Sequence, residues 1–202
     1  MTTAPFDARL EQILAVTAKV FADKGFHPTT MREVSRATGM SLAGLYHYIK
    51  GKDELLFLIQ QDSFTRVLAG AEAAVAAGHS PADRLERFIR HHVTFFASHM
   101  SEMKVLSHEA NSLAGRRLSA INGLKRRYVD MLRGLIADVE RDQPSAPDPQ
   151  VAAYALFGMM NWIYNWYNPA GALSPEALAE RFSQLFLFGL TTPAPSIHPN
   201  GG

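Results

Sequence analysis

The sequence predicts an all-α fold, in which a small three-helix domain at the N-terminus precedes a larger helical domain. Apolar residues recur at helical spacing along most of the chain, and no stretch alternates apolar and polar residues as a half-buried strand does. Glycine and proline stand between the apolar stretches, where helices end. We expect the first domain over residues 1–52, the second over 53–190, and a disordered tail rich in Pro and Gly over 191–202.

Composition excludes several classes of protein. Of the 202 residues, 47% are hydrophobic and 19% are charged, which is ordinary for a globular chain and too apolar for a disordered one. There is no cysteine, so disulfides and thiolate metal sites are excluded. The N-terminus lacks the pattern of a signal peptide, and no apolar run has the length of a membrane span. We therefore expect a cytoplasmic protein.

Three helices are predicted in the first domain. The apolar stripe of the first helix consists of Leu10, Ile13, Leu14, Thr17, Val20 and Phe21. Thr30 can cap the second helix with its hydroxyl, and Glu33 can reach back to complete a capping box. Gly39 fits the left-handed residue that ends a helix, and Ser41 can cap the third. Two short helices around a glycine turn are typical of the helix-turn-helix, which places its second helix in the major groove of DNA.

Residues 10–56 resemble the N-terminal part of the TetR family of bacterial transcriptional regulators. The matching residues are Ala18, Phe21, Gly25, Phe26, Thr29, Thr30, Glu33, Val34, Ala37, Gly39, Ser41, Leu45, Tyr46, Tyr48, Lys52, Glu54, Leu55 and Leu56. The chain departs from the family at Ile49, where Phe is usual. It also departs at Leu42 and Ala43, which carry no group that hydrogen-bonds a base edge.

The resemblance implies which residues meet double-stranded operator DNA. Thr30 and Arg32 begin the second helix, whose N-terminal N–H groups can hold a phosphate, and Lys52 resembles the family's phosphate-contacting lysine. Bases and phosphates are expected to face Ser41, Leu42, Ala43, Tyr46 and His47. The first 52 residues hold seven Lys or Arg and four Asp or Glu, as suits a surface that meets phosphates. Chance scatter of surface charge explains the same excess.

Six further helices are expected in the second domain, each beginning near a capping residue or a proline, or ending near a glycine. Five of them are expected over residues 53–77, 102–110, 111–140, 150–167 and 174–190. The remaining helix is expected to begin at residue 81 and to include the apolar residues up to 96. Asp53 is expected to cap the first of them. The prolines in the run 142–149 predict a loop, because three prolines cannot lie inside a helix.

The helix expected over 150–167 is apolar on nearly every side, and such a helix must be buried all round. Together with the last helix it resembles the pair by which TetR-like proteins build a four-helix dimer interface. A homodimer would also present two reading helices to successive major grooves. The alternative is that both helices belong to the core of a monomer.

An effector pocket is expected among the helices after residue 53, which are rich in aromatic residues and methionine. The expected ligand-binding residues are Phe96, Met103, Arg116, Arg117, Arg127, Asn161, Trp162, Tyr164 and Asn165. Arg117 falls on the apolar stripe of the helix over 111–140, so its charge needs a partner. That partner is either Glu109 or another internal acid, or an anionic group of the ligand.

The segment over 159–171 resembles a branch of the family that regulates fatty-acid or sterol-ring catabolism and responds to acyl-CoA thioesters. This implies a repressor of lipid or sterol catabolism genes that an acyl-CoA releases from its operator. The alternative is a multidrug-type repressor that senses apolar or cationic compounds, whose pocket would want buried carboxylates.

Neither an enzyme, a cofactor nor a metal site is expected. The sequence lacks a P-loop, a G-x-S-x-G motif and a dinucleotide-binding fingerprint. His91, His92, His99 and His108 fall in two neighbouring helices, where metal sites can use histidine. Ordinary polar positions explain these four residues better than a metal does.

Overall fold

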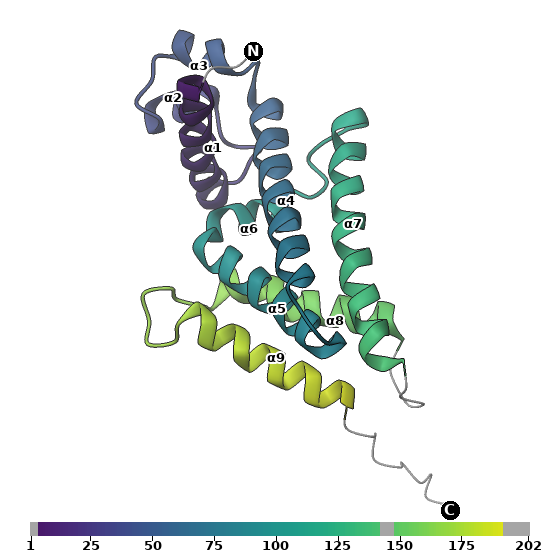
Figure 1. Cartoon of the computed structure of the whole chain (residues 1–202). Coiled ribbons are helices and arrows are strands. Elements are labelled where there is room, and N and C mark those ends of the chain that lie inside the picture. The colour runs from purple at the N-terminus through teal and green to yellow at the C-terminus, as the bar shows by residue number, and fades with distance from the viewer. Residues whose placement is uncertain (1–3, 142–147, 192–202) are drawn as a thin grey trace, which may run out of the picture.

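The structure is a computed structural model, and it describes residues 4–141 and 148–191. All regular structure in these two ranges is helical (Figure 1), which confirms the predicted all-α fold. The helices are α1 (Ala4–Lys24), α2 (Met31–Ala37), α3 (Leu42–Tyr48), α4 (Lys52–Ala76), α5 (Pro81–Ser98), α6 (Met100–His108), α7 (Gly115–Glu140), α8 (Pro149–Asn161), the 3-10 turn η1 (Trp162–Asn165) and α9 (Pro175–Thr191). The tail expected over 191–202 lies outside the described residues, except for Thr191.

The predicted helix-turn-helix is present, and its caps are formed as expected. Thr30 Oγ1 accepts from Glu33 N at 3.3 Å, while Thr30 N donates to the Glu33 carboxylate at 2.8 Å. Gly39 has φ +66°, the left-handed value that favours glycine, and the Ser41 hydroxyl accepts from Gly44 N at 3.0 Å. The Lys24 ammonium, the Thr30 N–H and the Thr30 hydroxyl all donate to the Glu33 carboxylate and lower its pKa to about 2.

One hydrophobic core lies beneath the helix-turn-helix. Leu45 of α3 is fully buried in it, and the start of α4 contributes Leu55 and Leu56. Residues much later in the chain complete this core, including Val105 of α6 and Ile121 of α7. The first domain therefore rests on the α6–α7 region as well as on α4, although we expected its boundary at residue 52.

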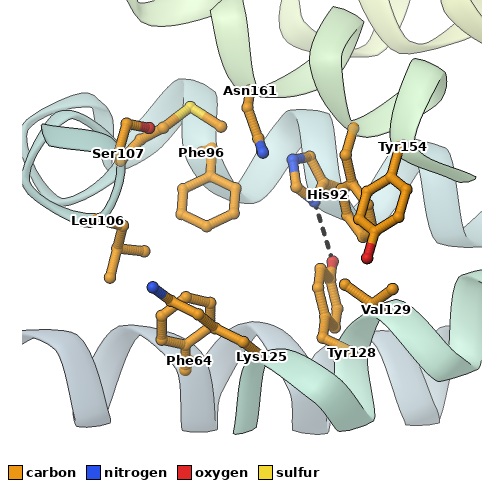
Figure 2. A pocket seen from close by; sticks show the side chains of 12 residues that line it. Phe64, His92, Phe96, Leu106, Ser107, Lys125, Tyr128, Val129, Tyr154 and Asn161 are labelled. Carbon is orange, nitrogen blue, oxygen red and sulfur yellow. Dashed lines mark hydrogen bonds between the residues drawn. The ribbon is translucent and has the colours of Figure 1, made fainter. Parts of the chain in front are cut away.

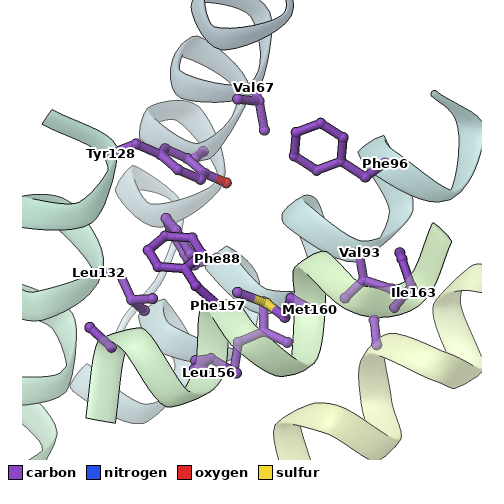
Figure 3. Close-up of a cluster of buried hydrophobic side chains, with 14 of the residues drawn as sticks. Val67, Phe88, Val93, Phe96, Tyr128, Leu132, Leu156, Phe157, Met160 and Ile163 are labelled. Atoms are coloured by element: carbon purple, nitrogen blue, oxygen red, sulfur yellow. The ribbon is translucent and has the colours of Figure 1, made fainter. Parts of the chain in front are cut away.

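A second core fills the other end of the molecule, where α5, α8 and α9 cross below α4 and α7 (Figure 1). Figure 3 shows side chains from α5, α7 and α8 meeting there. The rings of Phe88 and Tyr128 have centroids 5.0 Å apart, and Phe157 packs against both. Helices α4 and α7 run side by side between the two ends, so α4 belongs to both cores.

Several expected helix limits were wrong. Helix α4 begins at Lys52 with Gly51 as its N-cap and has no side-chain cap bond, so Asp53 does not cap it. Helix α7 begins at Gly115 instead of residue 111, because Ser112 N donates to the Glu109 carbonyl in a turn and Leu113 is buried in the first core. Helix α6 covers residues 100–108 instead of 102–110.

The helix expected over 150–167 is also interrupted. Helix α8 ends at Asn161, and a 3-10 turn carries the chain to Asn165. Within a single chain, the segment over residues 150–167 is not buried on every side. None of the helices in the two described ranges has the length and apolar character that crossing a membrane requires.

Candidate functional site

The expected base-reading residues lie together on α3 and at its N-terminus. Ser41, Ala43, Tyr46 and His47 are exposed, and Leu42 is half-buried. Leu45 faces the opposite way, into the core, and thereby fixes α3 against α2. The sequence predicted this grouping, and the DNA-contact role of each residue stays a prediction.

Lys52, expected at a DNA phosphate, has protein partners in this structure. Its Nζ donates to the carbonyls of His27 at 2.8 Å and Thr29 at 2.9 Å, and it lies 4.6 Å from the ring centroid of Phe26. The side chain therefore ties the start of α4 to the loop before α2. Arg32 is exposed at the start of α2, and the Thr30 hydroxyl is engaged in the cap.

A cavity of about 260 Å³ lies among α4, α5, α6, α7 and α8 (Figure 2). Its lining residues are Phe64, His92, Phe96, Met103, Leu106, Ser107, Lys125, Tyr128, Val129, Tyr154, Phe157 and Asn161. Three of the expected ligand-binding residues are among them: Phe96, Met103 and Asn161. The wall is mostly apolar and, among the described residues, contains the basic side chain of Lys125 and no carboxylate.

The three expected arginines do not line this cavity. Arg116 is exposed, and Arg127 forms an ion pair with Glu72 at 3.0 Å on the surface. Arg117 is half-buried and lies 5.9 Å from the ring centroid of Phe57, and no carboxylate within the described ranges forms an ion pair with it.

The expected protein partner of Arg117 is engaged elsewhere. The carboxylate of Glu109 accepts from Phe26 N at 3.0 Å and from the Ser112 hydroxyl at 2.6 Å.

The expected aromatic and amide residues after Asn161 also lie outside the cavity lining. Trp162 is 59% exposed, and the Tyr164 hydroxyl lies 3.0 Å from His108 Nε2. Asn165 is exposed, with its amide 3.4 Å from the Trp162 carbonyl. The chain leaves α-helical geometry at Trp162, so the positions of these side chains do not follow the periodicity of α8.

Sequence reasoning missed the main polar groups of the cavity wall, which are Lys125, His92 and Tyr128. The interpretation of the histidines as ordinary polar positions is wrong for His92, which is 1% exposed. The sequence did indicate this burial, because His92 stands four residues from both Phe88 and Phe96 on the apolar side of α5.

Burial shifts the pKa of each of these groups. It lowers the pKa of His92 to about 3; the nearby His91 acts in the same direction, and the Asn161 amide opposes both. Burial likewise raises the pKa of Tyr128 well above its ordinary value and lowers that of Lys125. The Lys125 ammonium lies 5.6 Å from the ring centroid of Phe64, and no carboxylate within the described ranges pairs with it.

Helix α6 connects the cavity to the DNA-reading domain. Met103 and Leu106 of α6 line the cavity, and the helix is followed directly by its C-cap residue Glu109, which is 8% exposed. The Glu109 carboxylate accepts from Phe26 N, and the Glu109 carbonyl accepts from Gln60 Nε2 at 3.0 Å. The end of α6 is therefore hydrogen-bonded both to the loop before α2 and to α4.

Apolar side chains are exposed along α8, the turn after it and α9. Each is more than half exposed: Val151, Tyr154, Trp162, Trp166, Leu185 and Phe188. A group of large apolar residues on a surface is typical of a protein–protein contact.

A helix-turn-helix domain joined by one long helix to a helical domain with an internal cavity defines a DNA-binding transcriptional regulator. The model of "Bacterial regulatory proteins, tetR family" matches residues 13–59, and that of "Tetracyclin repressor-like, C-terminal domain" matches residues 78–190. The chain therefore belongs to the TetR family of bacterial regulators and is not an enzyme.

Similar proteins agree with this assignment. The HTH-type transcriptional repressor KstR2 of Rhodococcus jostii is 23% identical, over 96% of this chain and 99% of its own. AibR, solved in complex with isovaleryl coenzyme A and operator DNA, is 29% identical with a TM-score of 0.77, over 92% of this chain and 100% of its own. A fatty acid metabolism regulator protein of Bacillus subtilis is 19% identical, over 76% of this chain and 83% of its own.

Proposed function

We propose that the protein is a homodimeric cytoplasmic repressor of lipid or sterol catabolism genes, which an acyl-CoA thioester releases from its operator. The observation that carries the proposal is an apolar cavity whose wall holds a half-buried lysine without a carboxylate partner in the described residues. Similarity to AibR, which binds isovaleryl coenzyme A, supports the effector class. Similarity to KstR2 supports repression.

The charge of the cavity wall favours an anionic effector over a cationic one. Lys125 is partly removed from water, and burial lowers its pKa, so its ammonium would gain from an anion nearby. The cation-binding pocket of a multidrug-type repressor would want carboxylates, and no carboxylate from the described part of the chain lines this cavity. The acyl part would then lie among Phe96, Met103 and Phe157.

A second cation extends this basic side of α7 away from the cavity. Lys125 lies over Phe64 and Arg117 over Phe57, so two cation–aromatic pairs follow the contact between α4 and α7. The two cations are eight residues apart, which places them about 12 Å apart along the helix. The phosphates of an extended CoA would then meet Arg117 and the exposed Arg116.

Release from DNA would follow from a shift between two conformers. An effector can lower operator affinity only if it binds better to the conformer whose reading helices are wrongly placed. Helix α6 would carry the change, because it lines the cavity and its last residues hold Phe26 and Gln60 through Glu109.

Assembly through α8 and α9 is part of the proposal. The exposed apolar residues of these helices would be covered by a second copy of the chain, and two-fold symmetry would present both α3 helices to one face of the DNA. A monomer in light scattering at micromolar concentration would contradict this assembly.

Calorimetry with matched ligands tests the effector class. Acyl-CoA esters should bind more tightly than the corresponding free acids and than cationic dyes, and should lower operator affinity. Lys125→Met should weaken CoA-ester binding by about tenfold, the equivalent of 1.4 kcal/mol. The control is Arg126→Met, which removes a positive charge from the exposed side of the same helix and should change little. Tighter binding of cationic dyes would favour the multidrug alternative.

A further inference from the structure

The most buried polar groups of the cavity form a pair. His92 Nδ1 lies 3.1 Å from the Tyr128 hydroxyl, and the two residues are 1% and 4% exposed. The rings of Phe88, Phe96 and Phe157 surround them. Polar atoms in such surroundings are costly unless each is hydrogen-bonded.

One atom of this pair lacks a hydrogen bond of normal geometry within the described residues. His92 Nε2 is fully buried and forms no hydrogen bond within the described part of the chain. The Asn161 amide points toward it without reaching a good hydrogen-bond geometry, and both groups border the cavity (Figure 2).

Proton counting shows that the pair keeps one free donor. A neutral imidazole carries one N–H and a phenol carries one O–H, and the bond between them uses only one of these protons. If Tyr128 donates to Nδ1, then the Nε2–H of His92 is free. If Nδ1 donates to Tyr128 instead, the phenol O–H is free and Nε2 is a free acceptor. The low pKa of His92 keeps the ring neutral at physiological pH.

We propose that the natural effector carries a keto or hydroxyl oxygen on its acyl part, and that this oxygen accepts the free proton of the His92–Tyr128 pair. The inference rests on the proposed function and names the acyl class. The thioester itself is a poorer candidate for this contact, because it must lie toward solvent, where the CoA continues. The pair lies among the fully buried residues of the wall, whereas Ser107, Tyr154 and Asn161 are exposed.

A purely hydrocarbon acyl group would leave the donor unpaired. Sites built around a hydrogen bond discriminate strongly against analogues that lack the bonding group, because the buried polar atom of the site then loses its water and gains nothing. Oxygenated acyl groups should therefore be selected over saturated ones of the same size.

Matched pairs of CoA esters test this on the wild-type protein. Examples are the esters of 4-oxocyclohexanecarboxylic and cyclohexanecarboxylic acid, and of 5-oxohexanoic and hexanoic acid. Calorimetry should show at least tenfold tighter binding of the oxo or hydroxy member of a pair. Equal affinity for both members overturns this inference and leaves the proposed function intact. Absence of binding by every CoA ester overturns both.

Variants then locate the donor. At least one of Tyr128→Phe and His92→Leu should reduce the preference for the oxygenated ester several-fold, and the variant that does so identifies the group that holds the free proton. Ser107→Ala is the matched control, because it removes another hydroxyl of the cavity wall that lies on the exposed side. Preserved preference in both single variants and in the double variant would overturn the assignment, provided that each variant still binds operator DNA.

Discussion

The two halves of the molecule differ in how their polar groups are satisfied. In the helix-turn-helix half, Thr30, Glu33 and Ser41 find partners within three residues along the chain. In the effector half, some buried side-chain atoms have no hydrogen-bond partner among the described residues, namely Gln60 Oε1, Ser63 Oγ, His92 Nε2 and both carboxylate oxygens of Glu140. None of the unpartnered buried atoms in the described ranges lies before residue 60.

This difference suits the two tasks of a regulator. A domain whose polar groups are already paired gains little by rearranging, so it can act as a rigid reader of DNA. A domain with unpaired polar atoms and a cavity can still gain free energy from a ligand that supplies the missing contacts. The predictions below would break or sharpen this contrast.

The largest expected effect is the loss of unfolding free energy when one leucine in each half is replaced by alanine. Leu45→Ala should cost about 2–5 kcal/mol of unfolding free energy, because Leu45 is fully buried in a close-packed core. Leu106→Ala should cost less, because one side of Leu106 already borders the cavity. Urea unfolding of both variants measures the difference. Equal costs would mean that the effector half is packed as tightly as the reading half.

Acid should weaken the effector half through His92. The pKa of His92 is about 3 in the folded protein and 6.5 in the unfolded chain, so the unfolded chain binds the proton more readily. Stability is therefore complete above pH 6.5 and falls as pH decreases below it, by about 2 kcal/mol between pH 6.5 and 5.

A histidine variant isolates this contribution in urea unfolding over the same pH range. His92→Leu should flatten the pH dependence relative to the wild-type protein. An identical slope in wild type and His92→Leu would show that the ring is not held neutral.

The connection between the halves should depend on Glu109. Glu109→Gln removes the charge that holds Phe26 N, and we expect it to weaken the coupling between effector and operator by about 1.5 kcal/mol. Operator affinity measured with and without saturating effector gives this quantity. Glu102→Gln, on the same helix outside this junction, is the control. Unchanged coupling in Glu109→Gln would mean that a contact other than Glu109 links the effector cavity to the reading domain.

The smallest expected effect concerns the reading half alone. Lys52→Ala should weaken binding to operator and random DNA alike, by about 1 kcal/mol, and should reduce the salt slope by about 1 if Lys52 contacts a phosphate. Alternatively, Lys52 acts through its hydrogen bonds to the His27 and Thr29 carbonyls and not through a phosphate. Weaker binding with an unchanged salt slope would mean that Lys52 only positions the loop before α2.

The sequence alone determined the all-α class, the helix-turn-helix and its caps. It could do so because those signals are local: Thr30 and Glu33, or Ser41 and Gly44, are three residues apart, and a helix brings such residues together by its own geometry. The exposed positions of α3 follow from the same periodicity.

Only the tertiary structure decided the chemistry of the cavity. His92 and Tyr128 are 36 residues apart, and Glu109 and Phe26 are 83 apart, so their contacts depend on how whole helices pack. The chain leaves α-helical geometry after Asn161, and Trp162, Tyr164 and Asn165 lie outside the cavity lining. Helical periodicity tells which face of a helix is buried, but not which helix lies opposite, and it is the opposite helix that decides whether a buried polar group is paired or left for a ligand.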